Sequence, residues 1–169
     1  MLIRTCWKLV FCFLLLAGVK STAIAEQASS TSARQQSERY AALEKSLSGA
    51  TMVGYFTDSH EPSTKLTSDR YDLKSVRHLG EGQWLFQTRI RYGEHDVTLP
   101  LTLPIYWAGD TPVITVEKLA IPGFGTFDAR VLIYANHYAG FWSGADHGGH
   151  LFGVIEREPK KKKGTADGR

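Results

Sequence analysis

Residues Trp84 to Tyr92, WLFQTRIRY, decide the fold because their side chains alternate between apolar and polar. Successive side chains of an extended chain point to opposite faces of a sheet, so every second residue shares a face. One face of this segment is apolar, with Trp84, Phe86, Ile90 and Tyr92. The other face is polar, with Gln87, Arg89 and Arg91. The pattern predicts a β-strand with one buried and one solvated face.

The segment that follows alternates in the same way over a longer span. Its apolar positions are Val97, Leu99, Leu101, Leu103, Ile105 and Trp107. Pro100 and Pro104 lie between them on the outward face. Because proline has no backbone N–H to donate to a neighbouring strand, we expect part of this strand to lie at a sheet edge or to bend at a corner.

Six more segments have strand character, and short turns rich in glycine separate several of them. They are residues 51–57, 70–79, 113–119, 127–134, 137–143 and 150–157. About eight strands joined by short connections predict one antiparallel all-β domain. We favour a single β-barrel, because a closed sheet leaves no strand edge exposed, and keep a β-sandwich as the alternative.

The first 25 residues have the organisation of a secretory signal peptide. A basic start precedes an apolar run from Leu9 to Val19, and small residues end the segment, so cleavage is expected after Ala25. The alternative is an uncleaved membrane anchor, but the apolar run is shorter than the roughly 20 residues of a spanning helix. We therefore expect an exported protein, periplasmic or extracellular, with no membrane span once the signal is removed.

The rest of the chain divides by composition into three parts. Residues 26–36 are mainly Ser, Thr, Ala and Gln and predict a flexible leader. Residues 37–158 form the all-β domain, which begins with a short amphipathic helix over residues 37–48 that ends at Gly49. Residues 159–169 predict a disordered basic tail, because they contain a run of four lysines and residues 159–164 include no apolar side chain to bury.

Composition excludes several classes of function. Both cysteines, Cys6 and Cys12, lie within the predicted signal peptide, so the mature chain has neither a disulfide nor thiol chemistry. The signal also holds three of the twenty basic residues and none of the seventeen acidic ones, which leaves the mature chain neutral. We expect no nucleic-acid partner for such a chain. The sequence contains neither a P-loop nor a dinucleotide fingerprint, and no cofactor is expected.

The segment YAGFWSGADHGGHLFG, residues 138–153, places glycines between large aromatic residues. Antiparallel pairing about a turn near residues 144–147 sets Trp142 opposite Gly149 or His150. Glycine beside an aromatic residue leaves room for the ring to lie across the neighbouring strand. We therefore predict a β-hairpin whose glycines serve packing.

The same segment raises the possibility of a metal site at His147, His150 and Asp146. The fourth candidate ligand, His137, lies about 17 Å along the strand from the turn and cannot join them. An H-x-x-H spacing suits a helix face, which the two glycines between these histidines oppose. We therefore predict no metal site.

Aromatic residues give the strongest positive signal for function. Small barrels fill their interior with such side chains or leave a pocket among them for one apolar ligand. The residues that we single out as a candidate ligand site are Trp84, Trp107, Phe124, Tyr138, Trp142 and His150. No catalytic residue is predicted, and we favour a non-enzymatic protein that binds a small apolar molecule.

Two other functions stay open. One is an envelope interaction or structural module that acts through its outer surface and basic tail. The other is a hydrolase that gathers loop carboxylates such as Asp58, Glu61, Glu94 and Asp96. An exposed aromatic patch favours the first, and two carboxylates about 5 to 9 Å apart in a cleft favour the second.

Several motifs in the second half of the chain are distinctive: WAGDTPVIT at residues 107–115, IPGFGTF at 121–127, ARVL at 129–132, and the hairpin at 138–153. With these motifs the chain resembles a group of small exported bacterial proteins of unknown function. The resemblance implies export and supplies no activity. Gly140-Phe141-Trp142 is also similar to the G-x-W motif of lipocalins, although theirs opens the first strand and this one lies near the end of the chain.

Overall fold

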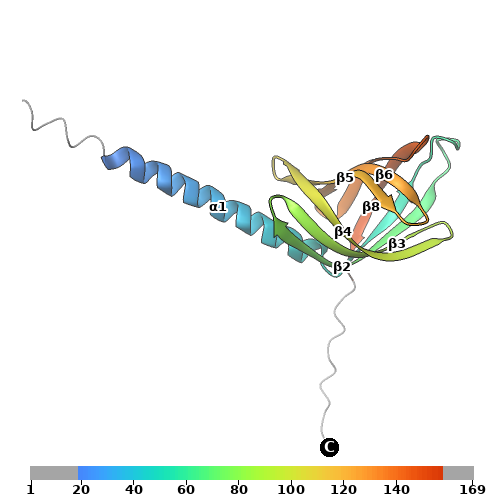
Figure 1. Cartoon of the computed structure of the whole chain (residues 1–169), viewed down its shortest axis with the longest axis horizontal. Coiled ribbons are helices and arrows are strands. Elements are labelled where there is room, and N and C mark those ends of the chain that lie inside the picture. Colours follow the sequence, from blue (N-terminus) through green and yellow to red (C-terminus); the bar gives the residue numbers. More distant parts are fainter. Residues whose placement is uncertain (1–18, 158–169) are drawn as a thin grey trace, which may run out of the picture. The chain divides into compact units, whose positions relative to one another are not determined.

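The computed structural model describes residues 19–157, with side chains from residue 31 onward. Its elements are α1 (Val19–Leu47), β1 (Ala50–Phe56), β2 (Thr67–Gly80), β3 (Gln83–Tyr92), β4 (His95–Ala108), β5 (Thr111–Ile121), β6 (Gly125–Tyr134), β7 (His137–Ser143) and β8 (Gly148–Glu156). Each strand pairs antiparallel with the next, and β8 pairs with β1 to close a barrel (Figure 1). The predicted barrel is confirmed.

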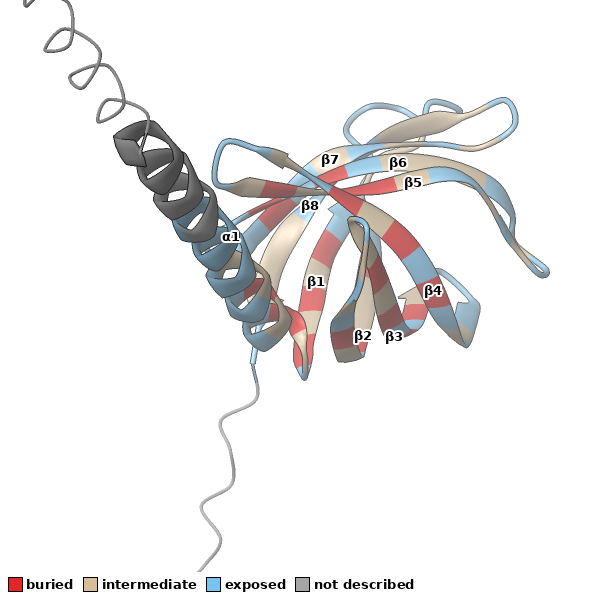
Figure 2. Ribbon diagram, turned by 60° about the vertical axis from the view of Figure 1, so that its left-hand side comes forward, coloured by how far each residue is buried: buried red, intermediate tan, exposed pale blue. Residues whose placement is uncertain are grey.

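The strands owe their place in the barrel to the alternation seen in the sequence. Buried and more exposed residues alternate along the strands in Figure 2. In β3, Trp84 and Phe86 are buried, and Gln87 and Arg89 between the inward positions are exposed. The buried face forms the inside of the barrel, so one apolar row from each strand builds a single core.

The helix is longer than the sequence predicted. It begins at Val19, so residues 26–36, which we expected to form a flexible leader, are helical, and the helix passes through the expected cleavage point after Ala25. No glycine or proline interrupts the segment, and alanine, glutamine and charged residues of good helix propensity recur along it. The predicted end at Gly49 is confirmed by its φ of 73°. The predicted tail at 159–169 lies outside the described residues.

The last turn of α1 belongs to the same compact unit as the barrel. Leu43 and Leu47 are buried. The hydroxyl of Ser48 donates to the carbonyl of Val76 (3.0 Å) and accepts its N–H (2.9 Å). Arg157, just after β8, donates to helix-end carbonyls including that of Ser46 (3.3 Å). These bonds fix the helix end to the later part of β2 and the end of β8.

The two prolines of β4 lie in a part of the strand that pairs on one side only. The strand pairs with β3 from His95 to Pro104, but with β5 only from Ile105 to Ala108. Pro100 and Pro104 therefore sit in the part of β4 that has no β5 partner. The expectation that part of this strand acts as an edge is confirmed.

The β7–β8 hairpin has the predicted register. Trp142 is opposite Gly149, and His137 is opposite Val154. Inward positions of β7 are occupied by Tyr138, Gly140 and Trp142, and outward positions by exposed residues. The alternation therefore separates the two aromatic residues that face the interior from Phe141, which faces solvent.

Candidate functional site

The barrel interior contains a cavity of about 440 Å³. Every strand contributes at least one side chain to its wall, and most of these are aliphatic or aromatic. Sites for small molecules have volumes of roughly 300–1,000 Å³ and are usually lined by apolar side chains. The cavity therefore has the size and chemistry of a site for one small apolar molecule.

Aromatic residues surround one end of this cavity, and we call them the aromatic collar: Phe56, Tyr92, Phe124, Phe127 and Trp142. Their rings touch in sequence, from Phe124 to Tyr92 (centroids 5.5 Å apart), then to Phe56 (5.9 Å) and to Trp142 (5.7 Å), each edge to face. Edge-to-face pairs add stability beyond the area they bury. The collar lies beside the turns that join β1 to β2, β3 to β4, β5 to β6 and β7 to β8, which form the mouth of the barrel.

Trp142 is held in the collar by a directed bond. Its indole N–H donates to the carbonyl of Thr57 at 3.0 Å. Thr57 follows β1, and its own N–H donates to the carbonyl of His150 (2.9 Å). The indole of Trp142 on β7 is therefore oriented by the residue that follows β1. That residue lies close because β8, the hairpin partner of β7, also pairs with β1 in the closed barrel.

The six aromatic and histidine residues selected from the sequence occupy different places. Trp142 and Phe124 line the cavity. Trp84 and Tyr138 are fully buried outside the lining, and Trp107 is half-buried on β4. His150 is exposed on the outer face, with its ring 5.0 Å from that of Phe141. The structure thus brings two of the six together at the mouth.

Thr88 supplies a polar group on the cavity wall. It lies on an inward position of β3, is only 5 % exposed and lines the cavity. Its hydroxyl oxygen has no hydrogen-bond partner among the described residues. Burying a hydroxyl without a partner costs about 1–3 kcal/mol. A ligand with one hydrogen-bonding group would recover that cost.

A buried carboxylate lies on the inner wall at Asp69, which is 3 % exposed. It accepts hydrogen bonds from the hydroxyls of Tyr138 (2.7 Å) and Tyr71 (3.1 Å). Burial raises the pKa of Asp69 above its ordinary value, and the two hydroxyl donors partly oppose that rise. Burial and the neighbouring carboxylate raise the pKa of both tyrosines, so they stay protonated donors.

Tyr138 reaches Asp69 across two glycines. Tyr138 is opposite Gly153, Gly153 is opposite Gly54, and Gly54 is opposite Asp69. A Cβ on Gly54 would lie 2.5 Å from the Tyr138 hydroxyl, and a Cβ on Gly153 2.7 Å from its ring. The ring therefore lies over neighbouring strands where glycine leaves room, as the sequence of the hairpin predicted.

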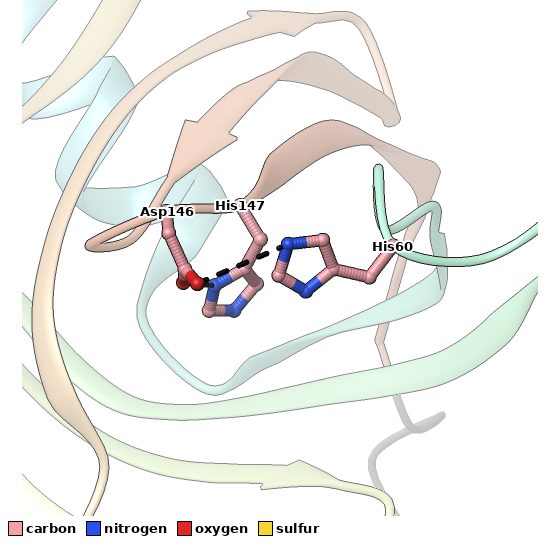
Figure 3. Close-up of side chains that lie close together, drawn as sticks. All are labelled: His60, Asp146 and His147. Carbon is pink, nitrogen blue, oxygen red and sulfur yellow. Dashed lines mark hydrogen bonds and ion pairs between the residues drawn. The ribbon is translucent and has the colours of Figure 1, made fainter.

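A second polar group of side chains lies at the mouth: His60, Asp146 and His147 (Figure 3). Asp146 is 3.1 Å from Nδ1 of His147 and 4.0 Å from Nε2 of His60. The two imidazole rings stack with centroids 5.3 Å apart. The hydrogen bond of Asp146 with His147, together with its electrostatic interactions with His60 and His147, holds the pKa of Asp146 below its ordinary value.

Backbone hydrogen bonds tie together the two loops that carry these residues. Ser59 donates its N–H to the carbonyl of Gly148 (2.8 Å), and the N–H of Gly148 donates to the Ser59 hydroxyl (3.2 Å). The turn itself is closed by the Gly144 N–H, which donates to the carbonyl of His147 (2.8 Å). The three side chains therefore stand on one connected backbone unit.

Asp58 contacts both histidine positions. One carboxylate oxygen accepts the backbone N–H of His60 (2.9 Å), and the other lies 4.0 Å from Nε2 of His147. Asp58 and His147 also line the cavity. The polar cluster thus borders the apolar site directly.

His60 was not among the residues predicted from the sequence to form a site. The metal ligands considered from the sequence were His147, His150 and Asp146, with His137 excluded as too distant. His150 is exposed on the outer face, and His137 does lie at the start of β7, away from the turn. The closure of the barrel was the signal that could have identified His60 as a neighbour of His147. Pairing of the first strand with the last places the loop after β1 beside the β7–β8 turn.

The loop carboxylates considered for hydrolysis are dispersed. Glu61 pairs with Lys65 at 2.6 Å on the surface. Asp96 accepts a hydrogen bond from Arg89 at 2.7 Å, and this bond lowers the pKa of Asp96. Of the four residues, Asp58 alone lines the cavity. The described residues therefore give no carboxylate pair from this set facing the cavity.

Comparison with models of known protein families, with curated proteins and with solved structures finds no match. Among residues 19–157, no helix has both the length and the apolar composition needed to cross a bilayer.

Proposed function

We propose that this protein is an exported, non-enzymatic β-barrel that binds a small apolar molecule in its interior. The observation that carries the proposal is the cavity of about 440 Å³ with an apolar wall. A wall of hydrocarbon favours a ligand by the area it removes from water, at roughly 25 cal/mol per Å² before the costs of association. The expected ligand is mainly apolar.

The polar groups on the wall refine the chemistry of the ligand. Thr88 offers one buried hydroxyl without a partner on a wall that is mostly aliphatic and aromatic, so a ligand with a single hydroxyl, carbonyl or ether group fits best. The aromatic collar at the mouth suits a flat or unsaturated group near the opening. Export rests on the signal-like N-terminal sequence.

Titration with an environment-sensitive apolar dye tests this proposal. Ala129 lines the cavity on β6, so Ala129→Phe should fill part of the space and weaken dye binding at least tenfold. Ala139 is exposed on the neighbouring strand β7, so Ala139→Phe adds the same ring outside the barrel and should leave binding unchanged. Equal binding by both variants would contradict an interior site.

A second candidate function is an envelope interaction through the outer wall. Five large apolar residues are exposed there on β1, β6, β7 and β8: Tyr55, Leu132, Tyr134, Phe141 and Phe152. Pairing places Leu132 in one row with Phe152 and Tyr55, separated only by Ala139. Exposed apolar patches often mark protein contacts. Cross-linking in the exported fraction that Phe152→Ser abolishes and Ala129→Phe leaves unchanged would favour this function over the first.

A further inference from the structure

Two histidines and an aspartate from opposite ends of the barrel sequence meet at the mouth, and nothing in the interior binding of an apolar molecule requires them. His60 comes from the β1–β2 loop, and Asp146 and His147 from the β7–β8 turn. One ligand atom from each lies within 4.8 Å of the other two. Imidazole nitrogen and carboxylate oxygen are the donors that Zn²⁺ and related divalent transition metals take.

We propose that His60, Asp146 and His147 form a binding site for a divalent transition-metal ion, with Zn²⁺ as its representative. Ligands at about 2.0–2.2 Å from a tetrahedral zinc lie roughly 3.3 Å apart. Nδ1 of His147 and Asp146 already meet that spacing at 3.1 Å. The three ligand atoms lie within 4.8 Å of one another, so His60 has to move by roughly 1–2 Å to reach that spacing. Its side chain is 58 % exposed and stacks only loosely on His147, with ring centroids 5.3 Å apart, which leaves room for this movement.

Asp58 gives the site a second feature typical of metal centres. Histidine ligands usually hold their other ring nitrogen against a carboxylate, which fixes the ring and raises its basicity. Nδ1 of His147 faces Asp146, and its Nε2 faces the Asp58 carboxylate at 4.0 Å. The second oxygen of Asp58 accepts the backbone N–H of His60. One carboxylate thus positions both histidine ligands.

The loops are connected before any metal arrives. Hydrogen bonds between Ser59 and Gly148 and between Thr57 and His150 continue the β1–β8 ladder into the loops. Binding would therefore order only side chains, which costs less than folding a loop around the ion. Three protein ligands leave a fourth position for water, as in open zinc sites. This inference does not rest on the apolar ligand, although His147 and Asp58 also border the cavity.

Isothermal titration of the chelator-treated full chain with Zn²⁺ tests the site, together with the visible absorption of bound Co²⁺. We expect saturable binding with one ion at this site. His60→Ala should weaken it at least tenfold without unfolding the barrel, since His60 is exposed. Asp58→Asn keeps an acceptor for the His60 N–H but removes the charge facing His147, and should weaken binding about tenfold.

His150→Ala is the matched control, because His150 lies on the same hairpin but faces outward. It should bind Zn²⁺ as the unchanged chain does. Cys6 and Cys12 are kept in every variant, so any thiolate binding is common to all and cancels in the comparison. Zn²⁺ binding that His60→Ala leaves unchanged, or no binding by the unchanged chain, would overturn the proposal. Neither result affects the dye titration of the interior.

Discussion

The barrel has a filled half and a hollow half. The largest fully buried side chains are Trp84, Tyr138, Leu47, Val76 and Thr115, and none of them lines the cavity. The hollow half is bordered by the collar at the mouth, where Trp142 and its neighbours keep partial exposure. Some positions of the barrel are therefore closely packed, whereas others border a space. The difference indicates that the fully buried positions contribute most to stability and that the positions around the cavity bind the ligand, within one sheet.

Replacing a tryptophan should have the largest effect, and should differ most between the two parts of the barrel. Trp84 is fully buried, whereas Trp142 borders the cavity. Trp84→Ala should lower the free energy of unfolding by about 3–5 kcal/mol, since it empties a fully buried position. Trp142→Ala should cost about 1–2 kcal/mol, because the ring is half-buried beside existing space, and should weaken dye binding. Chemical denaturation measures both. Equal losses at the two positions would mean that the halves are packed alike.

A methyl group added at Gly153, one of the two glycines between Tyr138 and Asp69, should have the next largest effect. Gly153→Ala places a methyl group 2.7 Å from the Tyr138 ring and against the carbonyl of Val53, so the strands must shift. Overpacking of this kind costs about 2–3 kcal/mol. Ser68→Ala, at an exposed position of β2, is the control and should stay within about 0.5 kcal/mol of the unchanged chain. A neutral Gly153→Ala would show that Tyr138 does not need the row.

Tyr138→Phe removes one donor to the buried carboxylate and keeps the ring. Asp69 then retains Tyr71 as a side-chain donor. We expect a loss of about 1–2 kcal/mol in the free energy of unfolding, because a buried acceptor loses its shorter hydrogen bond. Dye binding should not change, since neither Tyr138 nor Asp69 lines the cavity. If Tyr138→Phe lowered both dye affinity and stability, binding and stability would depend on the same part of the barrel.

Asp69 should make stability depend on pH. Its pKa is raised in the folded state, so the folded protein holds the proton more tightly than the unfolded chain does. Stability contributed by this group is therefore present at low pH and is lost as the pH rises from the ordinary value of 3.8 through the raised value. Asp69→Asn removes this titration. The stability of the unchanged chain relative to the variant should fall as the pH rises from 3.8 through the raised pKa of Asp69, and a constant difference would contradict the assignment.

Thr88→Val should have the smallest effect on stability, a gain of about 1 kcal/mol in the free energy of unfolding, because it removes a buried hydroxyl that has no partner and keeps the side-chain shape. Its informative effect is on binding. Ligands with a hydrogen-bonding group should lose affinity, and purely apolar ligands should not. An equal loss of affinity for both kinds of ligand would show that the Thr88 hydroxyl does not form a hydrogen bond with the ligand.

The sequence was sufficient for the strands and for local pairing. Alternation over residues 84–92 and the turn at 144–147 specify which side chains share a face and which are opposite, because these depend on neighbours in the chain. Barrel closure followed from the number of strands and their short connections. The added length of the helix was missed because a polar composition was interpreted as disorder, although the segment lacks glycine and proline.

The site was less accessible from sequence. Whether Trp84 or Trp142 borders a cavity depends on how side chains from all eight strands fill the interior, which no local pattern specifies. The contact of His60 with His147, and that of Tyr138 with Asp69 across two glycines, both need the closure of β8 on β1. Barrel closure was predicted, but the side-chain contacts that it creates depend on the register between β1 and β8, which no local pattern specifies.

The central claim is that the hollow half holds a small molecule, and native mass spectrometry of the protein recovered from its own exported fraction tests it most directly. The account predicts a mass above that of the polypeptide, lost on denaturation, and absent from Ala129→Phe recovered in the same way. A bare polypeptide mass for the unchanged chain, or extra mass that persists in Ala129→Phe, would contradict it.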